Sequence, residues 1–220
     1  MAQLLAGHVP LTPPLFGWLK RRPPPTVDTA AWQRVRATTP WLLHLDETRD
    51  ATLQALVAGF LQEKTITPLA GLTLDDDQRL QLAALCCLPL IGLGANGWAG
   101  WSQVLVYPDA FRVRRSHTDA AGVLHEYEDE LAGESWDAGP LILSWADVQA
   151  DLAEPDAGFC VAIHEMAHKL DALDGEMDGT PPLPRAWPRQ WAADFQRRYD
   201  AFCAEVDAGH DTAIDPYASE

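Results

Sequence analysis

The feature that most constrains the fold is the stretch of residues 156–175, which contains the pattern His-Glu-Met-Ala-His at 164–168. Apolar residues recur in this stretch at intervals of three and four, and this spacing predicts an amphipathic helix with one face in the core. The expected apolar face consists of Phe159, Ile163, Ala167 and Leu170. His164 and His168 are four residues apart, so they should project from one side of the helix, beside that face.

The spacing of these two histidines suits the coordination of a zinc ion. Zinc binds imidazole nitrogens at about 2.0–2.1 Å in a tetrahedral arrangement, and His164 and His168 can aim at one ion. Glu165 would project beside the ion and act as general base on a coordinated water, whose pKa the metal lowers to about 7. The alternative interpretation is an amphipathic helix with two partly exposed histidines and a surface glutamate.

A catalytic zinc site needs a third protein ligand, which the sequence leaves open. Asp174 follows His168 by six residues, where an extended form of the motif places its third ligand. The glycine of that extended form is replaced by Asp171, which could instead orient a histidine through its second ring nitrogen. The ligand could also be a glutamate from a later helix. Between the motif and the final residue, Glu220, the glutamates are Glu176 and Glu205.

Charge and cysteine content exclude several classes of function. The 220 residues include 32 acidic and 16 basic ones, for a formal charge of −16. Such a field repels phosphate backbones and anionic membrane surfaces, so we expect no direct binding of nucleic acid or membranes. Four cysteines form no disulfide framework, which indicates a reducing compartment. We therefore expect a cytoplasmic protein.

The longest uncharged stretch, residues 80–108, predicts a buried helix that ends near Pro89 and Gly92, because a membrane span needs about 20 apolar residues without such breaks. At the N-terminus the basic cluster Lys20–Arg22 follows the apolar residues, whereas a secretory signal has the opposite order.

The pattern along the chain predicts an α+β fold that is mainly helical, with a small antiparallel or mixed sheet. Residues 1–31 are expected to form a proline-rich arm, and residues 32–220 a single domain. The expected helices lie within 32–64, with Asp46 or Thr48 as N-cap, within 78–88 after the acidic residues Asp75–Asp77, and from 145 to 205. The expected strands are residues 103–108, 111–115, 123–128 and 140–145. Within the last one, residues 141–145 are the candidate edge for pairing with an extended substrate.

The segment HEMAHKLDALDG (164–175) resembles the active-site helix of the Mlc titration factor A family, a group of bacterial zinc metallopeptidases. Four further segments agree in order, and the resemblance runs from about Leu53 to the C-terminus. They are GLTLDDDQRLQLAALCCLPL (71–90), VLVYPDAFRV (104–113), GESWDAGPLILSWADV (133–148) and IDPY (214–217).

The resemblance implies a zincin-like domain with aminopeptidase-like activity on short peptides and, in enterobacterial members, binding to a glucose-responsive transcriptional repressor. It also implies that His164 and His168 are zinc ligands, that Glu165 is the catalytic base, and that Tyr217 hydrogen-bonds the developing oxyanion.

The sequence departs from the family at the third zinc ligand. The resemblance implies a glutamate on a helix after Tyr217, and Glu220 comes too early for that position. We therefore expect that the domain is truncated at its C-terminus and that the ligand lies beyond residue 220. The alternative hypothesis is a regulatory protein that sequesters a transcription factor with an incomplete metal site. A metal-dependent hydrolase acting on a non-peptide amide is a third possibility.

Overall fold

The computed structural model describes residues 25–118, 124–131, 133–135, 139–175, 177, 179–182 and 187–219. The helices are α1 (Thr29–Ala37), α2 (Pro40–Leu43), α3 (Glu47–Glu63), α4 (Asp76–Cys87), α5 (Trp145–Ala153), α6 (Val161–Asp171) and α7 (Pro188–Asp207). Short 3₁₀ helices are η1 (Leu88–Leu90), η2 (Ala95–Trp98), η3 (Pro155–Ala157), η4 (Ala172–Asp174) and η5 (Pro216–Ser219). The strands are β1 (Thr65–Pro68), β2 (Gln103–Tyr107), β3 (Phe111–Thr118), β4 (Leu124–Leu131), β5 (Gly133–Ser135) and β6 (Leu141–Ser144).

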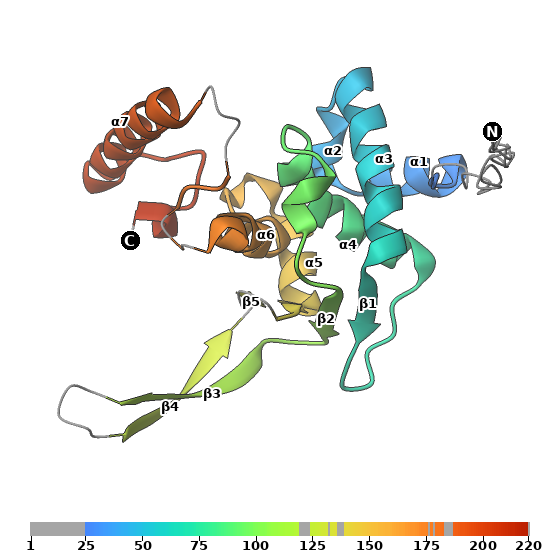
Figure 1. Cartoon of the computed structure of the whole chain (residues 1–220), viewed down its shortest axis with the longest axis horizontal. Coiled ribbons are helices and arrows are strands. Elements are labelled where there is room, and N and C mark those ends of the chain that lie inside the picture. The colour runs from blue at the N-terminus through green and yellow to red at the C-terminus, as the bar shows by residue number, and fades with distance from the viewer. Residues whose placement is uncertain are drawn as a thin grey trace, which may run out of the picture.

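Four strands form a sheet in the order β1-β2-β6-β5, in which β1, β2 and β6 are parallel and β5 is antiparallel to β6. The expectation of an antiparallel sheet is wrong for those three strands. Parallel neighbours need long crossover connections, and α4 supplies one between β1 and β2. The expected strands at residues 111–115 and 123–128 are not part of this sheet. They correspond to β3 and β4, which pair as a separate antiparallel hairpin. Figure 1 shows this hairpin extending away from the helices.

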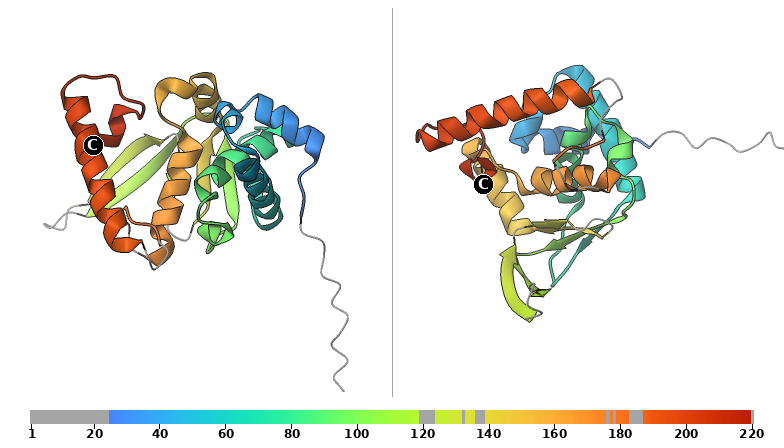
Figure 2. Two further views of the ribbon diagram at one scale, coloured as in Figure 1. Left: turned by 90° about the horizontal axis from the view of Figure 1, so that it is seen from above. Right: turned by 60° about the vertical axis from the view of Figure 1, so that its left-hand side comes forward.

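Helix α4 packs between α3 and α6, on the side of the sheet where the helices gather (Figures 1 and 2). Every residue from Leu80 to Cys87 is buried, as expected of a helix that is apolar almost all round. Asp75 caps α4 in a capping box with Gln78, and the Asp46 side chain accepts a hydrogen bond from the backbone N–H of Arg49 at the start of α3. The expected central helix and the cap at Asp46 are confirmed.

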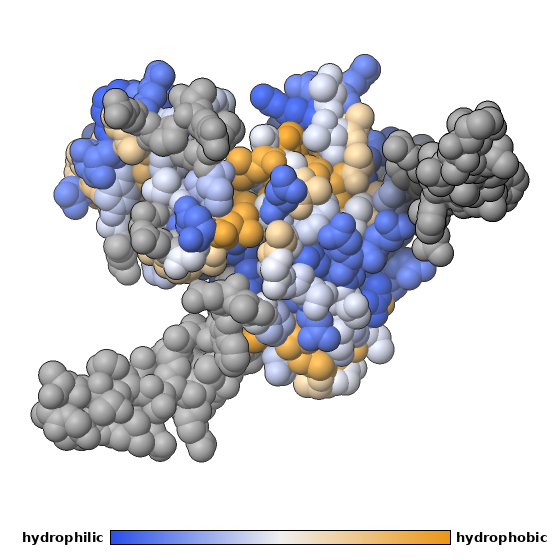
Figure 3. Space-filling model, viewed as in Figure 1, coloured by the Kyte–Doolittle hydropathy of each residue, from blue (hydrophilic) through white to orange (hydrophobic). Residues whose placement is uncertain are grey.

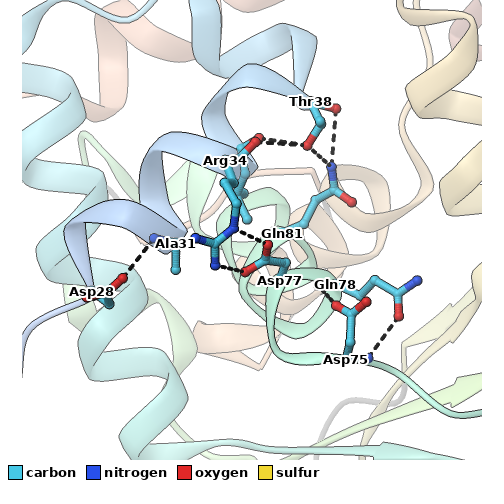
Figure 4. Close-up of polar contacts among 9 residues, drawn as sticks. Asp28, Ala31, Arg34, Thr38, Asp75, Asp77, Gln78 and Gln81 are labelled. Atoms are coloured by element: carbon cyan, nitrogen blue, oxygen red, sulfur yellow. Dashed lines mark hydrogen bonds and ion pairs between the residues drawn. The ribbon is translucent and has the colours of Figure 1, made fainter.

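Helix α1 is held against α4 by polar contacts at its exposed edge (Figure 4). The guanidinium of Arg34 donates from Nε and Nη2 to the two carboxylate oxygens of Asp77, at 2.6 and 2.8 Å. This pairing raises the pKa of Arg34 and lowers the pKa of Asp77, in each case mainly through the hydrogen bond. Gln81 lies deeper and donates to the carbonyl oxygen of Thr38 at 3.2 Å. The N-terminal helix is thereby joined to the core helix of the fold.

A buried lysine closes the end of α3. Lys64 Nζ donates to the carbonyl oxygens of Trp98, at 2.6 Å, and of Trp101, and it lies 4.3 Å from the centre of the Trp101 ring. Burial lowers the pKa of Lys64 because it disfavours the charged form. These contacts fix the loop between η2 and β2 against the C-terminal end of α3.

The apolar run in residues 80–108 contributes α4, η1, η2 and β2, not a long continuous helix. No helix in the described ranges combines the length and apolar character that a membrane crossing needs. Of the expected arm, residues 1–24 lie outside the described part of the chain, and residues 29–31 already belong to α1.

Apolar residues gather in the middle of the face drawn in Figure 3, between the positions of α7 and α3 in Figure 1. A hollow of about 420 Å³ lies between the η1–η2 segment and the C-terminal end of α6, and Leu93, Leu170 and Leu173 are part of its lining. Residues two apart on a helix point about 200° from each other, so Leu170 faces away from His168. This hollow is therefore separate from the histidine pair.

Candidate metal centre

Helix α6 places the His-Glu-x-x-His residues, and its rotation differs from the expected one. The side facing the core consists of Val161, Ala162, Glu165, Met166, Lys169 and Leu170. The expected apolar face is wrong at Ala167, which is exposed, while Ile163 is only partly buried. Contacts with α4, β5 and β6 set this rotation, and such long-range packing is not encoded in the local apolar spacing.

His164 and His168 are both partly buried, at one border of the core-facing side of α6. Their Nε2 atoms lie 3.1 Å apart, and the ring centroids are 4.7 Å apart with planes at 87°. Burial lowers the pKa of His164, and the neighbouring His168 lowers it further. A lowered pKa favours the neutral imidazole, which is the form that binds a metal ion.

The spacing of the two nitrogens fits a shared metal ion. Two nitrogen ligands at 2.0–2.1 Å in a tetrahedral arrangement are about 3.3–3.4 Å apart, close to the 3.1 Å between the Nε2 atoms of His164 and His168. A hydrogen bond between two neutral imidazoles also has about this length. A metal titration separates the two interpretations.

Glu165 exposes only 5% of its surface, so the residue between the histidines turns toward the interior of the fold. A surface position for this glutamate, which the alternative interpretation of the motif required, is wrong. A buried carboxylate is costly unless it has partners, and Glu165 has a polar or electrostatic interaction within the chain.

The structure does not bring either candidate aspartate into a metal-binding cluster with the histidines. Within the described ranges, no three His, Cys, Asp or Glu side chains come close enough to hold an ion together. Asp174 is exposed in η4, and Asp171 accepts a hydrogen bond from the Gly179 backbone N–H at 3.0 Å. The second oxygen of Asp171, Oδ1, is buried and has no hydrogen-bond partner among the described residues. Glu176 and Glu220 lie outside the described part of the chain.

Two aromatic rings flank His164. The Phe159 ring centroid lies 5.5 Å away, just before α6, and the Tyr217 centroid lies 6.2 Å away, in η5. Tyr217 is 58% exposed, and its backbone N–H donates to Asp215 Oδ1 at 2.8 Å. The structure thus brings Tyr217 next to His164, from a position 53 residues further along the chain.

The N-terminus of α6 has a cap that the local sequence does not predict. Its N-cap residue, Cys160, makes no side-chain cap, and Oδ2 of Asp151 in α5 accepts a hydrogen bond from the Val161 N–H at 2.7 Å. Burial raises the pKa of Asp151, whereas the bond from Val161 opposes that shift. A cap supplied by a different helix has no local spacing signal, so only the fold reveals it.

The expected substrate-pairing edge at residues 141–145 is wrong. Strand β6 is central, because it pairs with β2 on one side and β5 on the other, and all four of its residues are buried. A continuous apolar run of this kind is typical of a parallel strand in the sheet interior.

Comparison with known proteins defines the class to which this fold and helix belong. Residues 17–220 match the family model described as glucose-regulated metallo-peptidase M90, so the match begins well before Leu53. The chain therefore belongs to the M90 family of metallopeptidases, and membership of that family implies a metal cofactor. The resemblance seen in the sequence is confirmed.

Proteins named Mlc titration factor A are similar to this chain over most of its length. The one from Pectobacterium atrosepticum is 36% identical over 209 residues, which is 93% of this chain and 77% of the relative. The one from Klebsiella pneumoniae strain 342 is 35% identical over 191 residues, or 86% and 71%. An uncharacterized protein of Synechocystis, slr2042, is 36% identical over 191 residues, or 86% and 70%.

The cap at Asp151 is testable by unfolding. Asp151→Ala should lower the free energy of unfolding by about 1 kcal/mol, because the Val161 N–H loses its acceptor. Asp151→Asn keeps an oxygen acceptor and should lose less. Because folding raises the pKa of Asp151, the folded chain holds this proton more tightly than the unfolded chain. Asp151 should therefore make stability fall as pH rises from about 3.9 through the folded-state pKa, and Asp151→Asn should remove that dependence.

Urea denaturation of the three proteins between pH 3 and pH 7 measures both effects. Equal stability of Asp151→Ala and the parent chain would show that Asp151 does not cap α6.

The histidine pair is testable by metal binding. His164→Ala and His168→Ala should each weaken zinc binding by more than the roughly 10–100-fold that loss of an outer-shell partner costs, because a ligand itself is lost. His44→Ala, which removes an exposed histidine at the end of α2, is the matched control and should bind zinc as the parent does. Equilibrium dialysis gives the affinities. Equal zinc binding by all four proteins would leave the 3.1 Å contact as a hydrogen bond.

Proposed function

We propose that this chain is a zinc-dependent peptidase with a zincin-like domain, in which His164 and His168 hold the metal. The observation that carries the proposal is the 3.1 Å approach of their Nε2 atoms at the border of a helix that is otherwise fixed in the core. Membership of a metallopeptidase family supports the same conclusion. Imidazole nitrogens one helical turn apart are suited to zinc.

The residues around the pair suggest how the reaction proceeds. A zinc ion, when bound, lowers the pKa of a coordinated water and polarises the substrate carbonyl. Glu165 accepts a proton from the attacking water and returns it to the leaving amine, a role that suits a carboxylate shielded from solvent. The Tyr217 hydroxyl donates a hydrogen bond to the oxygen on which negative charge develops.

An extended peptide would bind along β5. Among the described strands, β5 pairs only with β6 and forms an edge of the sheet, and it contacts α6. A substrate strand added there offers its backbone hydrogen bonds to β5 and lies next to the helix of the histidines. Peptides in extended form, with a free amino end for aminopeptidase-like cleavage, are the proposed substrate class.

A second candidate function is protein binding by α7, which the exposed aromatic residues of that helix favour. Trp191 and Phe195 stack at 4.9 Å, while Trp187 and Phe195 are 58% and 53% exposed. Exposed aromatic residues are enriched at protein interfaces. The name of the relatives, Mlc titration factor A, suggests the Mlc transcriptional repressor as the partner. In this alternative the chain sequesters the repressor, and the metal site is incomplete.

Glu165→Gln tests the catalytic role. The variant should lose at least about 10²-fold in peptidase turnover, because the general base is gone, while zinc binding persists. Glu47→Gln removes an exposed carboxylate from the first turn of α3 and serves as the control with unchanged turnover. The assay uses amino-acid 4-nitroanilides with and without a chelator. Full activity of Glu165→Gln, or activity that ignores the chelator, would contradict the mechanism.

The binding function predicts a different pattern. Trp187→Ala and Phe195→Ala should each weaken binding to purified Mlc by about tenfold or more, because aromatic anchors dominate such interfaces. Leu43→Ala removes an equally exposed apolar residue on α2 and should leave binding unchanged. Chelation should also leave it unchanged. Surface plasmon resonance measures the affinities, and equal affinity of all variants would rule out α7 as the binding surface.

A further inference from the structure

Gly158 lies in the turn before α6 and has the left-handed φ of 78°. A Cβ atom built on this residue would meet three backbone atoms of the segment 213–215, Asp215 N at 2.7 Å, Ala213 O at 2.8 Å and Ile214 C at 2.9 Å. Contacts this short do not occur for real side chains, and backbone atoms cannot turn aside as a flexible side chain can. The segment 213–215 therefore packs directly on Gly158 because this residue has no side chain.

The segment 213–215 leads directly into η5, which contains Tyr217. The Asp215 N–H donates to the Gly158 carbonyl oxygen at 3.2 Å, and the Asp215 side chain in turn accepts a hydrogen bond from the Tyr217 N–H at 2.8 Å. At the other end of η5, the Tyr199 hydroxyl donates to the Ser219 carbonyl oxygen at 3.2 Å. These contacts hold η5 between α7 and the turn that begins α6.

The turn at Gly158 also sets the second ring beside His164. Phe159 follows Gly158 directly, and its ring lies 5.5 Å from that of His164, while Tyr217 lies 6.2 Å away. The turn at Gly158 thus places both aromatic neighbours of His164. Phe159 is the next residue in the chain, and Tyr217 follows the segment that packs against Gly158.

We infer that Gly158 is a positioning residue. Because it has no side chain, the segment 213–215 can pack directly against it, and this packing holds the Tyr217 ring beside His164. Gly158 touches neither the substrate nor the metal in this role. The catalytic consequence rests on the proposed peptidase function, whereas the positioning of Tyr217 does not.

Gly158→Ala is the direct test, and Gly209→Ala is its matched control. Gly209 has a similar φ of 71°, but a Cβ there would meet no atom of the described residues within 4 Å, so the control carries the backbone strain without the clash. In Gly158→Ala, amide exchange of residues 211–219 should become faster, and the nuclear Overhauser effect between the Tyr217 and His164 rings should disappear. Zinc affinity should stay as in the parent, because α6 itself is unchanged. Gly209→Ala should keep both the slow exchange and the Overhauser effect.

Values of kcat for an amino-acid 4-nitroanilide, compared between single and double variants, distinguish loss of one shared interaction from general loss of structure. Tyr217→Phe should lower kcat by roughly 10²-fold, as expected for loss of a hydrogen-bond donor to the oxyanion. Gly158→Ala should lower kcat to a similar degree, and the double variant should be no slower than either, because both changes remove the same interaction. Multiplying losses in the double variant would overturn the inference.

Asp215→Ala provides a second test that does not alter Gly158. It removes the acceptor of the Tyr217 N–H and should also abolish the Overhauser effect, so the inference stays testable if Gly158→Ala does not fold. An unchanged Overhauser effect in either folded variant would contradict the positioning role. If no form of the protein shows turnover, the peptidase proposal fails, and the exchange and Overhauser measurements still decide the role of Gly158.

Discussion

The burial of one side of α6 is the interaction on which the candidate site depends. Val161, Met166 and Leu170 pack into the core and fix the rotation of the helix, so the two histidines stay at its border. Lys169 is buried on the same side and donates from Nζ to the Gly139 carbonyl oxygen at 2.9 Å, which joins α6 to the segment before β6. A helix fixed in this way presents two imidazoles in a set geometry, which lowers the entropy that a metal ion would otherwise have to remove on binding.

The rest of the site is assembled from distant parts of the chain. Asp151 of α5 caps the start of α6, and η5 brings Tyr217 next to His164. Partial burial favours the neutral form of His164, the form that can bind a metal. The same helix therefore combines a buried side for stability with a half-exposed border for chemistry. His164 and His168 are only partly buried and Tyr217 is exposed, so solvent can reach this border.

Local signals in the sequence were sufficient for much of the fold. The expected cap Asp46 and the acidic residues Asp75–Asp77 mark the starts of α3 and α4, and the four-residue spacing of His164 and His168 predicts their approach. Strand β1 is not predicted, because it has only four residues, one of them a proline, and so carries little pattern. Strand direction also escaped prediction, since it depends on pairing between segments far apart in the chain. The packing of residues 213–215 against Gly158 also joins segments far apart in the chain, so local patterns do not predict it.

X-ray absorption at the zinc edge tests the central claim most directly, in a sample of this chain equilibrated with one equivalent of zinc. The account predicts a first shell that includes two imidazole nitrogens at about 2.0–2.1 Å, with the outer-ring scattering typical of histidine. Both imidazoles should vanish from that shell when His164 and His168 are replaced together. A spectrum without imidazole scattering, or one that the double replacement leaves unchanged, would contradict the assignment of α6 as the metal-binding helix.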